Sequence, residues 1–515
     1  MNSTARKRNQ AGNVCRYRLP MVLTACVLTT LALSGNAFAQ APPTLWTKTF
    51  GGTNIDVGYS VQQTRDGGYV IAGYTRSYGT MSGRNVWLIK TDQLGNEQWN
   101  RTYGGNADEE GYAVRQTTDG GYIIAGYTKS FGAGGTDMLL IKTDTAGNAL
   151  WTQTFGGTQD DEAYDVEQTL DGGYIAAGAT SSFGTAGSRD VWLIKTTAAG
   201  SEVWRRNLGG FGSDGARSIQ RTADGGYIIT GWTYSYGPGA VGNTWLVKTD
   251  SSGNAVWNKV FGGTDVDRGY SVQQTTDRGY IITGYTASSG AGLDDMQLIK
   301  TDSAGNEQWS KTFGGSGRDY GNQVRQTMDG GYIVAGYTLS FGAGGDDVWV
   351  VKTDSLGNQR WSATYGGTAS DVAYSVSKTS DGGYVLVGHT LSYGAGVHDV
   401  WLIRLAPEAV QVKERADLPG DFELYQNYPN PANPTTTISY TIPVGTQRGV
   451  SLRVYDVLGR EVATLVDEVQ GSHLIGGQAG FRSVKFDGSN LPSGVYFYRL
   501  SSGNFTQTRR LLLVR

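Results

Sequence analysis

Short apolar runs separated by polar turns follow one another along most of the chain. A representative run, Tyr122–Thr128, is rich in Ile and Tyr and follows an Asp-Gly-Gly turn. Runs of this length and composition predict β-strands bounded by tight turns. Because few long helical patterns interrupt them, the sequence predicts an all-β protein.

This run recurs seven times at an almost constant interval of 52 or 53 residues. A fixed period of this size, with several strands per copy, is typical of the blades of a β-propeller. The aspartates that open the turn in each copy are Asp66, Asp119, Asp171, Asp224, Asp277, Asp329 and Asp381.

Each period contains four strand-like pieces, which in the copy that starts at Trp99 are residues 99–103, 112–117, 122–128 and 138–143. Hairpin after hairpin predicts a four-stranded antiparallel sheet. The order of the pieces resembles that of WD-repeat-like propellers, in which the strand before the Asp-Gly turn is innermost. By that resemblance the Trp-containing strand is outermost, and its Trp packs between neighbouring blades.

The two ends of the array predict that the ring closes. Residues 45–50 form a Trp strand with no blade before it, and residues 400–405 form a strand of the fourth type with no Trp strand after it. We therefore expect the N-terminal strand to complete the seventh blade of a propeller spanning 45–405. An open solenoid, the alternative, would need capping units, which the sequence does not supply.

One copy departs from the turn pattern, because Arg278 replaces the first turn glycine. A residue with a side chain is strained at positive φ. The sequence therefore predicts that Gly279 and its equivalents carry the positive φ, and that Arg278 adopts an ordinary conformation.

Residues 1–39 have the pattern of a secretory signal peptide. A basic start precedes an apolar run, and a small-x-small motif predicts cleavage between Ala39 and Gln40. The apolar run is short for a membrane anchor, which is the alternative. The residues before Cys26 imitate a lipoprotein box, although few apolar residues precede it.

Charge and cysteine content exclude several classes of partner and chemistry. Both cysteines, Cys15 and Cys26, lie in the leader, so the mature chain has no disulfide, thiol nucleophile or cysteine-bound metal. Removal of the five basic residues of the leader changes the formal net charge from −3 to −8. This charge argues against nucleic acid and anionic membranes as partners.

Two series of acidic or amide residues repeat with the blades. They either cap turns through hydrogen bonds to the backbone or form an acidic rim that collects cations such as Ca²⁺. We expect the capping role. Apart from the Ca²⁺ of the alternative, we expect no cofactor. The first series is Asp56, Glu109, Asp161, Asp214, Asp267, Asp319 and Asp371. The second series is Asn85, Asp137, Asp190, Asn243, Asp295, Asp347 and Asp399.

An arginine and aromatic cluster distinguishes one stretch of the array from the other copies. Such a cluster could bind an anionic glycan, or it could reflect divergence of one copy, which we favour. Its members are Arg205, Arg206, Arg217, Arg221, Trp232, Tyr234 and Tyr236.

No catalytic motif stands out. The three histidines, His389, His398 and His473, form no metal-binding pair or Ser/His/Asp pattern. Near-identical blades also repeat one environment, whereas acid–base catalysis needs carboxylates in different environments. We therefore expect a binding or structural module rather than an enzyme. The alternative is a secreted polysaccharide-active glycosidase or lyase that uses the acidic residues.

The repeat ends before a linker at 406–420, and the remaining residues, 421–515, have another pattern. Their strand-like runs are short and closely spaced, which predicts a small Ig-like β-sandwich. These runs are 438–442, 450–456, 460–465, 482–486, 494–500 and 506–514.

This C-terminal segment resembles the type A C-terminal sorting domain of type IX secretion cargo. The resemblance covers most of 424–515, with Ala432 standing where the family usually has Phe. The residues that carry it include Asn427, Tyr428, Pro429, Asn430, Pro431, Gly494, Tyr496, Arg509 and Arg510.

The resemblance implies that the chain is recognised at the outer membrane by the type IX secretion machinery and by its C-terminal-domain processing protease. It also implies that the mature protein is released or attached to surface lipopolysaccharide. We expect a monomer that contacts an extracellular glycan or protein, and whose two parts share few contacts.

Overall fold

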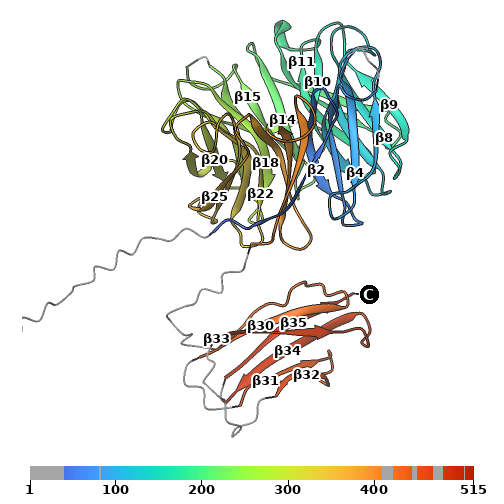
Figure 1. Cartoon of the computed structure of the whole chain (residues 1–515). Coiled ribbons are helices and arrows are strands. Elements are labelled where there is room, and N and C mark those ends of the chain that lie inside the picture. Colours follow the sequence, from blue (N-terminus) through green and yellow to red (C-terminus); the bar gives the residue numbers. More distant parts are fainter. Residues whose placement is uncertain are drawn as a thin grey trace, which may run out of the picture.

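The computed structural model describes residues 40–79, 83–239, 241–408, 422–443, 449–467, 480–503 and 505–514. These residues form a ring of seven four-stranded sheets and a separate pair of smaller sheets (Figure 1). A single 3-10 turn, Thr185–Gly187, is the helical element of the described residues. The structure contains no helix in these ranges that is long and apolar enough to cross a membrane. The predicted leader, Ala39 included, and most of the linker lie outside the described residues.

Each sheet of the ring is antiparallel, and its strands follow chain order from the axis outward, except that β1 is the outermost strand of the seventh sheet. The innermost strands are β2 (Asp56–Gln63), β6 (Glu109–Gln116), β10 (Asp161–Gln168), β14 (Asp214–Arg221), β18 (Asp267–Gln274), β22 (Asp319–Gln326) and β26 (Asp371–Lys378). The second strands are β3 (Tyr69–Thr75), β7 (Tyr122–Thr128), β11 (Tyr174–Thr180), β15 (Tyr227–Thr233), β19 (Tyr280–Thr286), β23 (Tyr332–Thr338) and β27 (Tyr384–Thr390).

The third strands are β4 (Asn85–Thr91), β8 (Asp137–Thr143), β12 (Asp190–Thr196), β16 (Asn243–Thr249), β20 (Asp295–Thr301), β24 (Asp347–Thr353) and β28 (Asp399–Leu405). The outermost, Trp-containing strands are β5 (Glu97–Tyr103), β9 (Ala149–Phe155), β13 (Glu202–Leu208), β17 (Ala255–Phe261), β21 (Glu307–Phe313), β25 (Gln359–Tyr365) and β1 (Thr44–Phe50).

Burial explains the composition of these strands. All seven residues of β7 and of β8 are buried, because both faces of a blade pack against its neighbours. Strands buried on both faces need continuous apolar runs. The outermost strand β9 alternates between exposed and half-buried residues, which matches its mixed composition.

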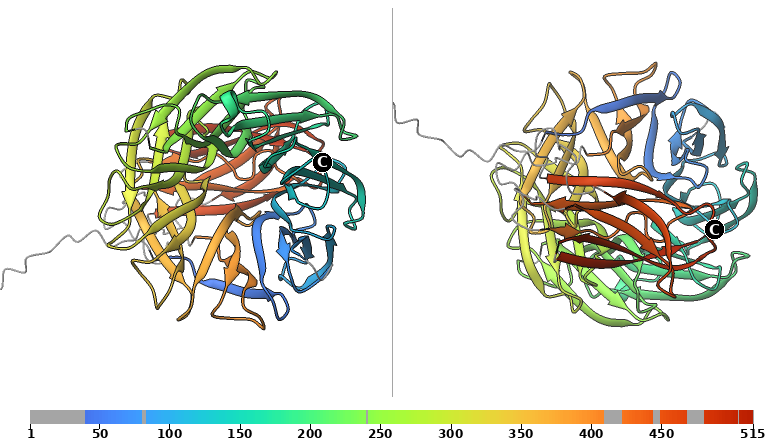
Figure 2. Two further views of the ribbon diagram at one scale, coloured as in Figure 1. Left: turned by 90° about the horizontal axis from the view of Figure 1, so that it is seen from above. Right: turned by 90° about the horizontal axis from the view of Figure 1, so that it is seen from below.

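The ring closes through the N-terminal strand, as predicted. Strand β1 pairs antiparallel with β28, in a register that joins Phe50 to Val400 and Lys48 to Leu402. The first and seventh blades then pack together, since Ile71 of β3 and Val387 of β27 belong to one buried cluster. Figure 2 shows the blades arranged around a common centre in chain order.

The outer tryptophans pack between neighbouring blades, which confirms their predicted role. The ring of Trp99 in the first blade lies 5.9 Å from that of Tyr122 in the second. A side chain at Gly147, in the outer turn of the second blade, would collide with the Trp99 ring. All six turns that join a third strand to an outermost strand therefore need both the positive φ and the small size of their glycine.

The prediction for the Asp-Gly turns is wrong. The first glycine has positive φ in every copy that carries it, and Arg278 has φ +68°, while Gly279 has an ordinary φ. The second glycine is required for another reason. A Cβ at Gly279 would lie 2.1 Å from the carbonyl oxygen of Thr301 on the next strand. Equivalent first glycines such as Gly225 face open space, so an arginine side chain fits there at the cost of backbone strain.

The C-terminal part consists of two packed sheets. One contains β29 (Glu423–Leu424), β30 (Thr435–Ile442) and β33 (Gly480–Asp487). The other contains β32 (Glu461–Asp467), β31 (Ser451–Tyr455), β34 (Gly494–Ser502) and β35 (Phe505–Leu513), in that order. Their inner faces share one buried cluster that includes Ile438, Leu452, Phe486 and Tyr498, as in a β-sandwich.

Candidate functional site

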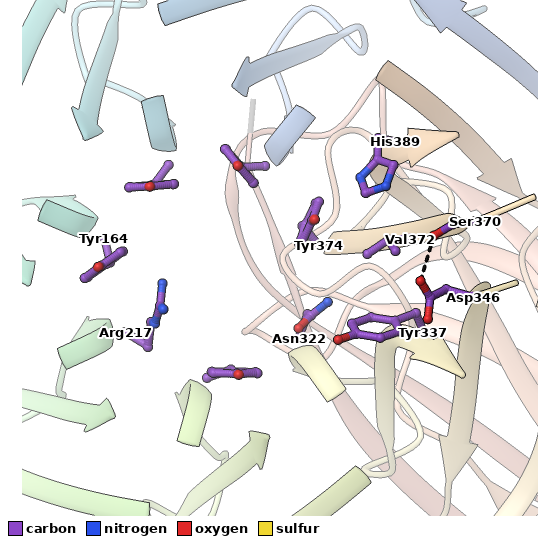
Figure 3. A pocket seen from close by; sticks show the side chains of 12 residues that line it. Tyr164, Arg217, Asn322, Tyr337, Asp346, Ser370, Val372, Tyr374 and His389 are labelled. Atoms are coloured by element: carbon purple, nitrogen blue, oxygen red, sulfur yellow. Dashed lines mark hydrogen bonds between the residues drawn. The ribbon is translucent and has the colours of Figure 1, made fainter. Parts of the chain in front are cut away.

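The most distinctive cavity lies on the axis of the ring, where the innermost strands meet. The fourth residue of each of these strands is a β-bulge, so that Tyr59, for example, has no partner between the pairs Gly58–Gly73 and Ser60–Ala72. A bulge redirects the extra side chain. The seven bulged residues line a cavity of about 500 Å³ (Figure 3). They are Tyr59, Tyr112, Tyr164, Arg217, Tyr270, Asn322 and Tyr374.

Five tyrosines form most of this axial belt. The ring of Tyr59 lies 5.0 Å from those of Tyr112 and Tyr374, and Tyr112 lies 5.2 Å from Tyr164. Burial raises the pKa of Tyr164 to about 12 and also raises the pKa of Tyr59. These two tyrosines are therefore neutral at physiological pH, and the tyrosine rings present flat apolar faces with hydroxyl groups at their edges.

Arg217 and Asn322 interrupt the belt. The Arg217 guanidinium carbon lies 4.1 Å from the ring centre of Tyr164 and 5.8 Å from that of Tyr270. The Asn322 side-chain amide donates a hydrogen bond to the carbonyl oxygen of Ala373 at 2.7 Å. These two residues make the cavity asymmetric although the scaffold around it is a repeat.

The remaining lining residues come from the sixth and seventh blades. Figure 3 shows Tyr337, Asp346 and Ser370 on the side of the cavity opposite Arg217. The Ser370 hydroxyl donates a hydrogen bond of 2.7 Å to Asp346. The cavity thus has a cation on one wall and a carboxylate on the other.

His389 also lines this wall but carries no charge at neutral pH. Burial and then the neighbouring His398 lower the pKa of His389 to about 4. The two imidazole rings are stacked at 4.6 Å. Nδ1 of His389 is buried, and no described residue forms a hydrogen bond with it. His473 lies outside the described residues.

The first acidic series is enclosed rather than exposed as a rim. All seven side chains are buried at the start of the innermost strands. Asp161 accepts hydrogen bonds from the backbone N–H of Gly157 at 2.8 Å, the Ser182 hydroxyl at 2.7 Å and the Thr180 hydroxyl. The remaining members likewise accept the backbone N–H of the second glycine in the preceding Gly-Gly turn. This is the geometry of a turn cap.

The second series lies beside the first at the junction between blades. Asp137, for example, accepts the backbone N–H of Ala133 at 3.0 Å. Burial raises the pKa of Asp137, and the adjacent Asp161 raises it further. Burial likewise raises the pKa of Asp347, and the adjacent Asp371 raises it further. No group of three or more His, Cys, Asp or Glu side chains in the described residues is arranged to hold a metal ion.

The structure does not bring the predicted arginine and aromatic cluster together. Arg205 and Arg206 lie on the outermost strand β13, where Arg205 pairs with Glu202 at 2.6 Å. The Tyr236 ring packs at a tilt against Trp245, a contact that several other blades repeat with their own residues. Arg221 lies at the end of β14, where its backbone N–H donates to Glu167.

Three members of that cluster do belong near the axis. Arg217 lies 5.4 Å from the Trp232 ring, and Arg268, which was not predicted, lies 5.2 Å from the same ring. Arg268 also donates a hydrogen bond of 3.2 Å to the Tyr234 hydroxyl.

Sequence reasoning missed the axial belt, although a signal for it exists. The first residue of every innermost strand is acidic, whereas the fourth position reads Tyr, Tyr, Tyr, Arg, Tyr, Asn and Tyr. A position that varies within an otherwise regular repeat is free of the packing constraint that the copies share. Its place beside the axis follows from the β-bulge, which the repeat pattern does not show.

The sorting-motif residues cluster along one edge of the C-terminal sandwich. The buried Asn427 donates hydrogen bonds from its side chain to Pro429 and Thr436, while Tyr428 is exposed. Asn430 accepts the backbone N–H of Leu512, and Asn430 also donates to the carbonyl oxygen of Arg510. The backbone N–H of Ala432 donates to the carbonyl oxygen of Leu512, so the motif is held against the last strand, β35.

The remaining motif residues fix that last strand to its neighbours. The Tyr496 hydroxyl donates to the carbonyl oxygen of Pro492 at 2.8 Å, and Arg509 donates to the carbonyl oxygen of Leu424 at 3.1 Å. Gly494 begins β34 opposite Leu513. Ala432, which stands where the family usually has Phe, is fully buried in the core.

Comparison with known families identifies the C-terminal part. Residues 426–514 match the family model of the secretion system C-terminal sorting domain. The chain is thus a type IX secreted protein that interacts with the type IX secretion machinery and reaches the cell surface or the extracellular space. None of the curated proteins matches this sequence.

Two solved structures with partial similarity to this chain are an oxidase and a hydrolase. One is a fungal alcohol oxidase of the AA5 family in complex with copper, with 12% identity, a TM-score of 0.42, and coverage of 92% of this chain and 100% of that chain. The other is a puromycin hydrolase, with 12% identity, a TM-score of 0.42, and coverage of 79% of this chain. The present chain spans 62% of that hydrolase chain.

Proposed function

We propose that the propeller is a secreted or surface-displayed binding module, and that the axial cavity holds its ligand. The observation that carries this proposal is the break in symmetry at the axis. Turn-capping and core residues are almost the same in all copies, but the bulged residues and those around them differ. A closed ring places these differences in one cavity, and its volume lies in the range of small-ligand sites.

The chemistry of the cavity suits a carbohydrate better than a metal or a reactive intermediate. Tyrosine rings offer flat faces for the C–H face of a sugar, and their hydroxyls, Asn322 and Asp346 offer partners for sugar hydroxyl groups. We also propose that removal of the leader and of the sorting domain yields the mature protein, either released or attached to surface lipopolysaccharide.

We further propose that the protein is not an enzyme. The titratable groups of the cavity support this, because Tyr164 keeps its proton and His389 stays neutral near pH 7. General acid–base catalysis works best with a pKa near the working pH. The rival function, a polysaccharide-active enzyme, would require the buried carboxylates to reach substrate, although each already accepts a backbone N–H.

A glycan array, combined with an assay for released reducing sugar, tests both functions. We expect retention of a glycan without release of reducing ends, and loss of retention in Tyr112→Ala. The control is Phe211→Ala, which removes an aromatic ring that is 87% exposed and does not line the cavity. Release of reducing sugar by the wild type, but not by a carboxylate variant, would favour the enzyme. Retention that Tyr112→Ala leaves unchanged would refute the axial site.

A further inference from the structure

Resting on the proposed function, we infer that the ligand is an anionic sugar, such as a uronic acid, whose acid group binds Arg217. The starting observation is a substitution within the repeat. Arg217 occupies the bulge position at which five other blades have tyrosine, so the scaffold itself does not require a cation there.

The Arg217 guanidinium is held in place without being neutralised. The rings of Tyr164, Trp232 and Tyr270 surround it at 4.1, 5.4 and 5.8 Å. Its Nε is buried, and no described residue accepts a hydrogen bond from it. A guanidinium has five N–H donors, and aromatic faces satisfy its charge only in part.

Two other arginines near the axis have carboxylate partners. Arg115 pairs with Asp165 at 2.8 Å, and Arg189 pairs with Glu162 at 2.6 Å. Within the described part of the chain, no carboxylate forms an ion pair with Arg217. The neighbouring Arg268 likewise has no ion pair there, so two guanidiniums flank Trp232 on this wall.

The arrangement specifies the orientation of the ligand. A carboxylate matches the fork of N–H groups on a guanidinium and forms short, charge-assisted hydrogen bonds. The sugar ring would then cross the tyrosine belt, and its hydroxyl groups would face Asn322 and Asp346. A carboxylate of the ligand placed at the opposite end would meet Asp346 and be repelled, so the cavity distinguishes the two orientations.

Calorimetric titration of the full chain with D-glucuronate and with its uncharged methyl ester tests the inference. The ester removes the negative charge of the acid group and adds one methyl group. We expect glucuronate to bind about tenfold or more tightly than the ester, which corresponds to one hydrogen-bonded charge pair. The advantage should shrink as salt is added.

Arg217→Tyr is the matched variant, since the fold accepts tyrosine at this position in five blades. It should bind both probes equally, whereas Arg206→Gln, on the outermost strand, should behave like the wild type. Equal binding of the two probes by the wild type would overturn the anionic ligand but leave the axial site intact. Absence of binding by both probes, together with an array signal that Tyr112→Ala does not change, would overturn the inference and the proposed function together.

Discussion

The ammonium group of Lys195 lies 2.9 Å from Oδ2 of Asp171 and joins the end of β12 to the turn before β11. The Lys195 side chain is almost fully buried and also donates to the carbonyl oxygen of Thr196. The same pair recurs in every blade, with Arg404 and Asp381 in the seventh. A buried cation needs such partners, so the turn aspartate serves the third strand as well as the turn.

These pairs make the propeller sensitive to acid. Hydrogen bonds from Thr169 and then Lys195 lower the pKa of Asp171 from its usual 3.8 to about 2. A lowered pKa in the folded state gives stability that is complete above the unfolded value and is lost as the pH falls through the folded value. The melting temperature should therefore fall between about pH 4 and pH 2. The effect per pair is modest because these aspartates are more than half exposed.

Asp171→Asn should reduce the slope of melting temperature against pH in this window. Glu307→Gln, a change at an exposed position on the outermost strand β21, is the control and should follow the wild type. If Asp171→Asn and wild-type curves run parallel, the pair is not a source of the acid sensitivity.

The two turn glycines should respond differently to alanine. Gly225→Ala should lower the free energy of unfolding by about 1 kcal/mol, because only the positive φ opposes it. Gly226→Ala should cost about 2–3 kcal/mol or more, since its Cβ would lie 2.1 Å from the carbonyl oxygen of Thr249. Denaturant unfolding of the two variants gives the comparison, and equal costs would contradict it.

Arg278→Gly should stabilise the fifth blade. Arg278 has a left-handed backbone conformation, which is strained for a residue with a side chain but not for glycine. Relief of this strain should increase the free energy of unfolding by about 1 kcal/mol. The effect is measured as an increase in the unfolding midpoint, and an unchanged or lower midpoint would show that the Arg278 side chain makes a compensating contact.

The buried acidic series should prove structural but not uniform. Asp161→Asn should cost about 1–3 kcal/mol, since the new NH₂ group would face hydrogen-bond donors. Asp267→Asn should cost less, because one oxygen of Asp267 is buried without a hydrogen-bond partner among the described residues. Thermal unfolding of both variants, with and without millimolar Ca²⁺, provides the test. A melting temperature that rises with Ca²⁺ and falls with chelator would support the cation alternative instead.

The sorting domain should be removable without loss of the propeller. Among the described residues, the hydrogen bond that joins the two parts runs from the exposed Tyr428 hydroxyl to Sδ of Met328 at 3.2 Å. Deletion of residues 424–515 should leave the melting temperature of the propeller nearly unchanged and abolish secretion. Met328→Ala, which removes this contact but keeps the sorting domain, is the control for stability. A decrease of many degrees on deletion would refute modularity.

The architecture and the destination of this protein follow from its sequence alone. The interval between Asp66 and its six equivalents specifies the blades, and the unpaired Trp46 strand specifies how the ring closes. Both patterns are local and recur along the chain. Because every copy shows the same pattern, the weak signals of single copies reinforce one another. The sorting domain was equally clear, because its motif residues are close together in sequence around Asn427.

The residues that meet at the axis, and the turn position that has positive φ, became apparent from the three-dimensional fold. Tyr59 and Arg217 are separated by 158 positions in the sequence. A bulge in each strand, rather than the hydrophobic pattern, directs both side chains toward the same cavity. The Asp-Gly turn was misassigned for a similar reason. Position 279 requires glycine because the backbone of the adjacent strand passes too close for a side chain. That constraint comes from the sheet rather than from the turn.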